Sequence, residues 1–146
     1  MNTLDIRAIL ERLPLRYPML LIDQVLEYHP HRSIRAVKNV SYNEQFFSGH
    51  FPHRPLLPGV IVLEALTQAA SLLWALSEPA EAGSNLVGLD KARFRKPVLP
   101  GDQLLLSARF ERSLKAMRRF STVACVGPDQ VASAEIMLIA ETPDLT

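Results

Sequence analysis

The sequence predicts an α+β fold in which a six-stranded antiparallel β-sheet wraps around one long central α-helix. Two observations lead to this class. One long apolar run of good helix formers lies in the middle of the chain, and six segments rich in β-branched and apolar residues flank it. Their order, a short helix, two strands, the long helix and four strands, is typical of an antiparallel sheet. We expect a single domain, residues 1–146.

The part of the chain before the long helix contains one short helix and one hairpin. Apolar residues share one helical face over residues 4–13, and Thr3 is placed to cap the first turn. Residues 20–28 and 33–40 are predicted to be two strands, and the turn between them, residues 29–32, contains a proline between two histidines. This segment is therefore predicted to be a β-hairpin.

Residues 41–58 contain too much proline and glycine for a regular element and are predicted to form an ordered loop. Gly59 opens the central helix, which continues over residues 60–76 after the proline at position 58. These 17 residues are apolar on nearly all sides. At about 1.5 Å per residue they span only about 25 Å and include four polar side chains, so we expect a helix wrapped by protein and no membrane span.

Four further strands follow a polar connection over residues 77–84. They are predicted over residues 86–97, 104–112, 117–126 and 131–140, with hairpin loops at 113–116 and 127–130. The sequence contains no internal repeat or low-complexity segment.

Composition and charge exclude several classes of protein. With 48% hydrophobic and 21% charged residues the chain has globular usage, and its net charge of +1 lacks the basic bias of a nucleic-acid binder. Basic residues concentrate in segments 91–96 and 109–119, which are either solvated strand faces or a surface for an acidic protein partner. The first residues lack the pattern of a secretion signal, so we expect a cytoplasmic location. The lone Cys125 lies in an apolar run and is predicted to be a small core residue.

Glu64 is the first residue that points to chemistry, because it is the only charged side chain between Arg54 and Glu78. Burial of a carboxyl group favours its neutral form, which would make Glu64 a proton donor near neutral pH. Gln68, four residues later, lies on the same helical face and is placed to hold it by hydrogen bonding. In the alternative interpretation, Glu64 faces solvent early in the helix, where the macrodipole favours a negative charge.

His50 supports the catalytic interpretation, because it lies in the loop that leads into the helix carrying Glu64. An imidazole is the usual general base at neutral pH. The other three histidines, His29, His31 and His53, are predicted to be exposed to solvent and serve as a comparison with His50. Neither a set of metal ligands nor a nucleophile motif is present, so we expect no metal and no cofactor. Gly59, at the helix start, is a candidate to bring a backbone N–H close to a carbonyl oxygen.

These residues resemble the 3-hydroxyacyl-(acyl carrier protein) dehydratases of the FabZ type, from about Ile9 to Glu141. The stretches that carry the resemblance are LPLRYPMLLID at 13–23, KNV at 38–40, FFSGHFP at 46–52, PGV at 58–60, LEA at 63–65, QAA at 68–70, ARFRKPV at 92–98 and PGDQ at 100–103. Three positions depart from the pattern of the family: Leu15 replaces a usual His, His53 stands where Gly is common, and residues 84–86 replace an aromatic run.

The resemblance implies a hotdog fold and dehydration of (3R)-3-hydroxyacyl-[acyl carrier protein] to trans-2-enoyl-[acyl carrier protein] in fatty acid or related lipid and polyketide biosynthesis. His50 would be the general base and Glu64, from the other subunit of a homodimer, the general acid, with the Gly59 amide at the thioester carbonyl and Gln68 in support. Members of the family form dimers and often trimers of dimers, so the resemblance implies a homodimer and leaves the choice between dimer and hexamer open. Substrate-tunnel residues implied by the resemblance are Phe51, Pro58, Val60 and Phe94.

Two other functions fit the same predicted fold. A hotdog acyl thioesterase would use its carboxylate and helix N-terminus to direct water at the thioester carbon, and a noncatalytic subunit would bind the acyl group without turnover. The spacing from Pro58 to Glu64 matches the dehydratases more closely than the thioesterases. Related dehydratase-isomerases carry Asp at the position of Glu64, so we favour dehydration without isomerisation.

Overall fold

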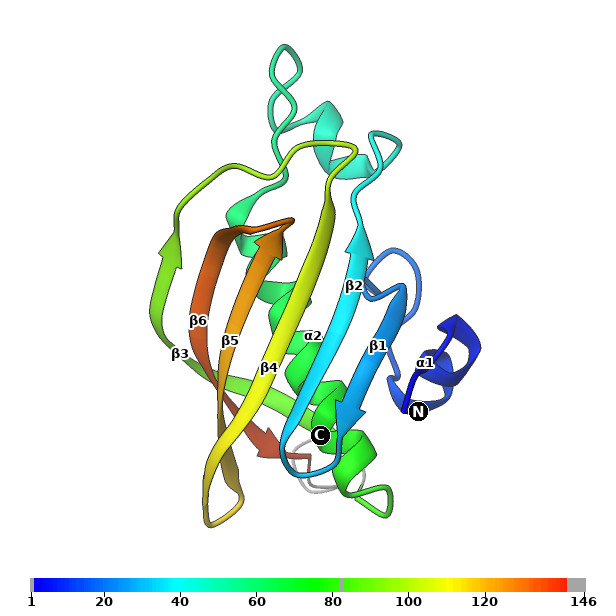
Figure 1. Ribbon diagram of the computed structural model, residues 1–146, viewed down its shortest axis with the longest axis vertical. Helices are drawn as coiled ribbons and strands as arrows, with labels where there is room; N and C mark the ends of the chain where they lie inside the picture. The colour runs from blue at the N-terminus through cyan, green and yellow to red at the C-terminus, as the bar shows by residue number, and fades with distance from the viewer. Residues whose placement is uncertain (1, 82, 142–146) are drawn as a thin grey trace.

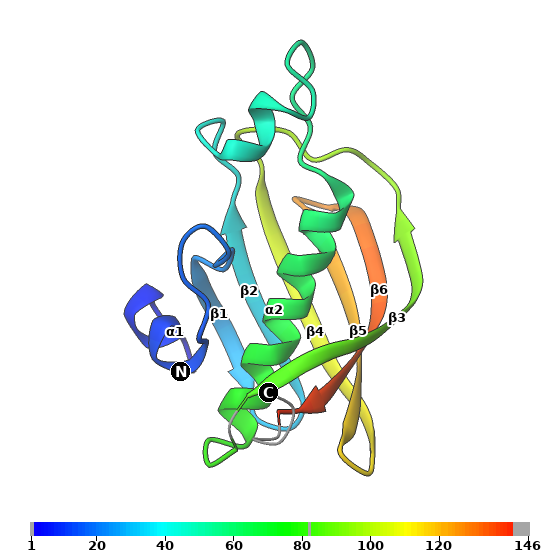
Figure 2. The same ribbon diagram turned by 180° about the vertical axis from the view of Figure 1, so that it is seen from behind.

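The computed structural model describes residues 2–81 and 83–141 and has the predicted architecture, a curved antiparallel sheet wrapped around one long helix (Figure 1). Figure 2 shows the same helix from behind, lying across the concave face of the sheet. The six strands have the order β1-β2-β4-β5-β6-β3. Met1, Ala82 in the predicted connection, and the predicted domain's last residues, 142–146, lie outside the described residues.

The first helix, α1 (Ile6–Arg12), begins two residues later than the sequence suggested, and its cap is not Thr3. The side chain of Asp5 accepts a hydrogen bond from the amide of Ala8, because a carboxylate at this position satisfies an unpaired donor of the first turn. Leu4, predicted to be helical, instead forms an isolated antiparallel bridge with Val25. The chain therefore enters along the sheet edge before it turns into α1.

The predicted hairpin is formed by β1 (Gln24–His29) and β2 (Ser33–Asn39). The first strand was predicted to begin at Leu20, which is wrong, because the amide of Leu21 is bound by a side chain of the central helix instead of a neighbouring strand. The stretch before β1 thus ties the sheet edge to the helix.

The loop between β2 and the central helix contains a short 3₁₀ helix, η1 (Gln45–Ser48), where the sequence predicted no regular element. Phe47 from this turn is buried in the core. The loop lies at one end of the sheet, beyond the start of the central helix (Figure 1).

The central helix, α2 (Gly59–Ser77), lies in the concave face of the sheet and supplies eleven buried residues to the core. By length and composition alone it would suffice to cross a membrane, but 61% of its apolar window is buried against the rest of the chain. Burial of this kind is typical of the core helix of a globular domain. Apart from its two end residues, Gly59 and Ser77, the residues of α2 that are not buried fall on one side of the helix: Val60, Ile61, Leu63, Glu64, Ser71 and Ala75.

The four strands after α2 are β3 (Ser84–Phe94), β4 (Gln103–Leu114), β5 (Met117–Val126) and β6 (Asp129–Ala140). The predicted third strand extended to Pro97, but the ladder ends at Phe94. The strand β3 forms one edge of the sheet, since within the described part of the chain it pairs with β6 alone. Several apolar side chains of this edge strand are more than 40% exposed: Leu86, Val87, Leu89 and Phe94.

Candidate functional site

His50 is held at the start of a tight turn by hydrogen bonds in both directions. The Nδ1 atom of its ring lies 3.1 Å from the carbonyl oxygen of Leu56, and the amide of Leu56 donates back to the carbonyl of His50 at 3.0 Å. A carbonyl oxygen only accepts, so Nδ1 must carry the proton and donate. In the neutral ring, the other nitrogen, Nε2, then has the lone pair that a general base requires.

A cavity of about 560 Å³ lies beside His50, between the start of α2 and the end of β3. Its size falls within the range typical of small-molecule sites. Of the predicted site residues, His50, Gly59, Val60 and Phe94 all line it, together with the basic side chains of Arg95 and Lys96. The structure therefore brings together the proposed base, the helix N-terminus and two of the four predicted tunnel residues.

The N-terminus of α2 presents backbone donors at this cavity. Pro58 is the N-cap residue, and its side chain makes no capping hydrogen bond, so the first amides of α2 are left without a side-chain acceptor among the described residues. Gly59 has no side chain to cover them. A Cβ atom at this position would lie 2.8 Å from Cε1 of Phe94, so the ring closes over the glycine. Backbone amides at a helix N-terminus favour a developing negative charge.

Glu64 lies in a second cavity, of about 340 Å³, which shares no lining residue with the cavity of His50. Its side chain is half-buried in the single chain, which lies between the two interpretations that the sequence left open, burial and exposure to solvent. The apolar residues next to Glu64 in the sequence lie on other sides of α2 and do not cover its carboxyl group. Gln68 is buried beside Glu64 and donates a hydrogen bond from Nε2 to Oε1 of Glu64 at 3.3 Å, as the spacing predicted.

The remaining predicted residues have clear positions. Phe51 is 42% exposed and stacks on the ring of His50 with 4.2 Å between ring centroids, while Pro58 caps α2. The control histidines His29, His31 and His53 are exposed. Figure 1 shows the turn after β1, which follows His29, and the loop before α2, which carries His53, at opposite ends of the molecule. Within residues 2–81 and 83–141, no three His, Cys, Asp or Glu side chains are grouped as metal ligands.

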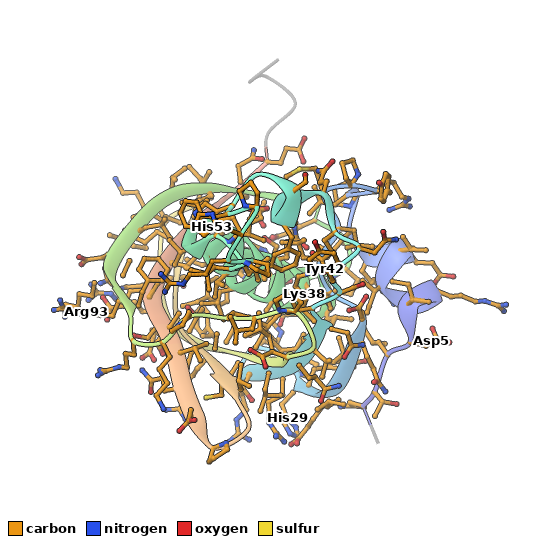
Figure 3. The ribbon with its side chains drawn as sticks, turned by 90° about the horizontal axis from the view of Figure 1, so that it is seen from above. Asp5, His29, Lys38, Tyr42, His53 and Arg93 are labelled. Atoms are coloured by element: carbon orange, nitrogen blue, oxygen red, sulfur yellow. The ribbon has the colours of Figure 1, made fainter. Side chains whose placement is uncertain are left out.

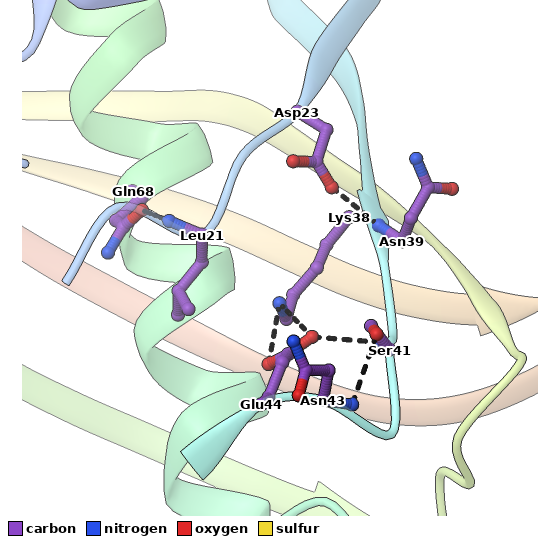
Figure 4. A network of polar contacts seen from close by, with 8 residues as sticks. All are labelled: Leu21, Asp23, Lys38, Asn39, Ser41, Asn43, Glu44 and Gln68. Atoms are coloured by element: carbon purple, nitrogen blue, oxygen red, sulfur yellow. Dashed lines mark hydrogen bonds and ion pairs between the residues drawn. The ribbon is translucent and has the colours of Figure 1, made fainter. Parts of the chain in front are cut away.

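Sequence reasoning missed a buried ion pair at the base of the loop that carries His50. Lys38, at the end of β2, is 4% exposed, and its Nζ lies 3.1 Å from both carboxylate oxygens of Glu44. The amide of Ser41 donates to the same carboxylate at 3.0 Å, and Figure 4 shows these contacts closing the turn. The signal in the sequence was a lysine at an inward position of a predicted strand, six residues before a glutamate.

Comparisons with known sequences identify the family of the chain. The family model described as a FabA-like domain matches residues 13–135. A protein of Burkholderia lata named 3-hydroxyacyl-[acyl-carrier-protein] dehydratase FabZ is 51% identical, over 97% of this chain and 94% of its own length. A protein of the same name from Burkholderia cenocepacia is 52% identical over the same shares.

Solved structures share the fold at much lower identity. The dehydratase heterocomplex ApeI:P of Xenorhabdus doucetiae has a TM-score of 0.76 at 16% identity, covering 92% of this chain and 91% of its own. The sigma28-regulated virulence protein Cj0977 of Campylobacter jejuni has a TM-score of 0.70, also at 16% identity, covering 97% and 93%. The predicted hotdog fold is confirmed. Because the family model matches most of the chain and the relatives are 51% and 52% identical in sequence, the chain belongs to the FabA-like family, among the 3-hydroxyacyl-[acyl-carrier-protein] dehydratases of the FabZ type.

Proposed function

We propose that this protein removes water from (3R)-3-hydroxyacyl-[acyl carrier protein] and forms trans-2-enoyl-[acyl carrier protein] in fatty acid or related lipid biosynthesis. The activity is the one named for relatives that are 51% and 52% identical over nearly the whole chain. The observation that carries the proposal is the shared cavity of His50 and the α2 N-terminus, where the imidazole ring and the first backbone amides of the helix meet. Its setting in lipid synthesis fits a cytoplasmic location, which we also propose.

The first half of the reaction uses the His50 cavity. Nε2 of His50 takes the proton from C2 of the acyl chain, and the C–H electron pair moves toward the thioester carbonyl. Charge that develops on the carbonyl oxygen is stabilised by the amides at Gly59 and the positive end of α2. The carbonyl of Leu56 holds His50 in the required tautomer.

The second half needs an acid, because hydroxide is a poor leaving group. Electrons return from the carbonyl to form the C2–C3 double bond, the C3–O bond breaks, and the departing oxygen takes the proton of Glu64 to leave as water. His50 has then gained one proton and Glu64 has lost one. Exchange with water restores both groups for the next turnover.

We propose that the acid comes from a second copy of the chain. In one helix, Gly59 and Glu64 are separated by about 140° around the axis and about 7.5 Å along it, so they face different sides. Their separate cavities agree with this angle. A homodimer would place Glu64 of the partner subunit over the His50 cavity, and three such dimers would form a hexamer. The unpaired edge of β3, with exposed Leu86 and Val87, offers the surface for pairing.

The basic residues at the mouth of the His50 cavity suit an acidic carrier protein. Arg95 and Lys96 line the cavity, and Lys91 and Arg93 lie on β3 just before them, all exposed. Figure 3 shows Arg93 projecting from the rim of the molecule. Since exposed charges mainly steer encounter, we propose that this segment guides the carrier to the cavity.

The activity is tested with purified protein and 3-hydroxyacyl chains of several lengths on acyl carrier protein, followed by mass spectrometry. We expect loss of one water, abolished in His50→Ala and Glu64→Gln. His53→Ala, an exposed histidine of the same loop, is the matched control and should keep wild-type turnover. Free acid as product would favour a thioesterase, and no turnover of any chain length would favour a binding subunit.

The shared site is tested by mixing the two inactive variants. If each site takes His50 from one copy and Glu64 from the other, subunit exchange should restore about one quarter of wild-type activity, because half of the dimers are mixed and each has one intact site. A site built within one chain would give no recovery. Mixing either variant with itself provides the baseline.

A further inference from the structure

Gln68 makes more contacts than a residue that only supports Glu64 would need. It lies one turn after Glu64 on α2, and its side chain is 1% exposed. Its Oε1 accepts from the amide of Leu21 at 2.9 Å. Its Nε2 donates to the carbonyl of Met19 at 2.7 Å and to Oε1 of Glu64 at 3.3 Å. Both hydrogens of the amide group are thus used.

The backbone of the segment before β1 fixes which way this amide points. If the amide were rotated by half a turn, its NH₂ group would face the N–H of Leu21 and its oxygen would face the carbonyl of Met19. Two hydrogen bonds would become two repulsive contacts in a buried place, which is costly. The orientation is therefore set by polar groups that cannot change role, and an N–H must face Glu64.

We propose that Gln68 is a positioning residue that directs the acidic proton of Glu64 onto Oε2. This inference rests on the proposed function, in which Glu64 is the acid. In a neutral carboxyl group the better acceptor is the carbonyl oxygen, so an N–H at Oε1 leaves the hydroxyl on Oε2. Once that proton has moved to the leaving oxygen, the same N–H stabilises the carboxylate that remains. Backbone groups of Met19 and Leu21 act on the reaction through this amide.

Few other charges face this site. The cavity around Glu64 is lined by Arg12 at the end of α1 and by Glu141 after β6, which are its other ionisable side chains within the described residues. Both remain in any variant of Gln68. A change in the pH dependence of such a variant is therefore attributable to the amide itself.

The test uses Gln68→Met and Gln68→Glu in the full-length protein. We expect kcat to fall about tenfold or more while KM stays within about threefold, since the loss is in proton transfer and not in binding. The alkaline limb of the kcat profile should move to higher pH in Gln68→Met, because the carboxylate loses its donor. It should move further in Gln68→Glu, where a second carboxyl group adjoins the first. Gln103→Met, at an exposed glutamine, is the matched control.

Lower kcat with an unmoved alkaline limb in both variants would overturn the proposal and leave Gln68 a purely structural residue. If the variants fail to fold, the wild-type protein with ¹⁵N-labelled glutamine side chains supplies the test. The NMR chemical shifts of the Nε2 protons of Gln68 should change as Glu64 titrates and should not change in Glu64→Gln. A wild-type signal that does not depend on pH would refute the hydrogen bond between Gln68 and Glu64. Full activity in Glu64→Gln would instead refute the proposed function.

Discussion

Replacement of Lys38 by methionine should destabilise the protein by about 2–3 kcal/mol. Methionine retains the length of the buried stem but leaves the carboxylate of Glu44 without its cation. The two Nζ–oxygen distances of 3.1 Å correspond to an attraction of about 5 kcal/mol at an effective dielectric constant of about 20, before desolvation is subtracted. Breaking a buried pair costs about 3–5 kcal/mol, and we expect less here because Glu44 is 19% exposed and keeps the amide of Ser41.

The measurement is chemical and thermal unfolding at one fixed protein concentration, since an oligomer's apparent stability depends on concentration. A loss of 2–3 kcal/mol corresponds to about 5–10 °C in Tm for a chain of this size. Glu44→Gln should cost a similar amount, because the ammonium group of Lys38 is more buried than its partner, at 5% side-chain exposure. The double variant Lys38→Met/Glu44→Gln should cost less than the sum, because neither charge is then left alone.

Two results would refute this reasoning. A cost below about 0.5 kcal/mol for Lys38→Met would place the pair among ordinary surface ion pairs. A double variant that equals the sum of the two single variants would show that Lys38 and Glu44 do not act on each other. The contacts drawn in Figure 4 would then describe neighbouring groups without energetic coupling.

Two further predictions concern groups away from the proposed site. The hydrogen bond from His29 holds the pKa of Glu27 below its ordinary value of 4.5. Any stability from this exposed group is therefore present above pH 4.5 and is lost as the pH falls through the lower pKa of the folded state. An NMR titration of the carboxyl group should show the low pKa, and His29→Ala should raise it. Gly101 has a φ of +97°, and a Cβ added there would meet open space. Gly101→Ala should therefore lower the free energy of unfolding, measured in urea, by about 1–3 kcal/mol from backbone strain alone. Gly49 also adjoins open space but has a φ of −111°, so Gly49→Ala should be nearly neutral.

The parts of the fold that sequence predicted well are those specified by local patterns. The central helix, the succession of helices and strands along the chain, and the hairpin of β1 and β2 follow from apolar periodicity and turn residues, and they are confirmed. The errors occur where a residue far away in the sequence determines the local backbone structure. Leu21 looked like a strand residue because its neighbours are apolar, but its amide is bound by Gln68, 47 residues later. Thr3 looked like a cap, but Leu4 pairs with Val25 and delays the helix.

For the candidate site, the sequence identified individual residues better than their surroundings. His50 and Gly59 meet at one cavity because a short loop joins them, which sequence proximity already indicated. The environment of Glu64 could not be predicted in the same way. Its neighbours in the sequence are apolar, but whether its own side of α2 is covered depends on how far the sheet curves around the helix.

The side of α2 that the sheet leaves half-covered is also apolar, and for this reason the helix sequence is apolar on nearly all sides. A helix buried by one sheet on one side normally has a polar opposite side. Here the less covered side still carries apolar residues, with Val60 70% exposed and Ile61 and Leu63 half-buried around Glu64. Apolar area of this kind is stabilised only if another surface covers it. The same second copy that we propose to complete the His50 cavity would remove these residues from water, and it would also bury Glu64, an environment in which a carboxyl group favours its neutral form.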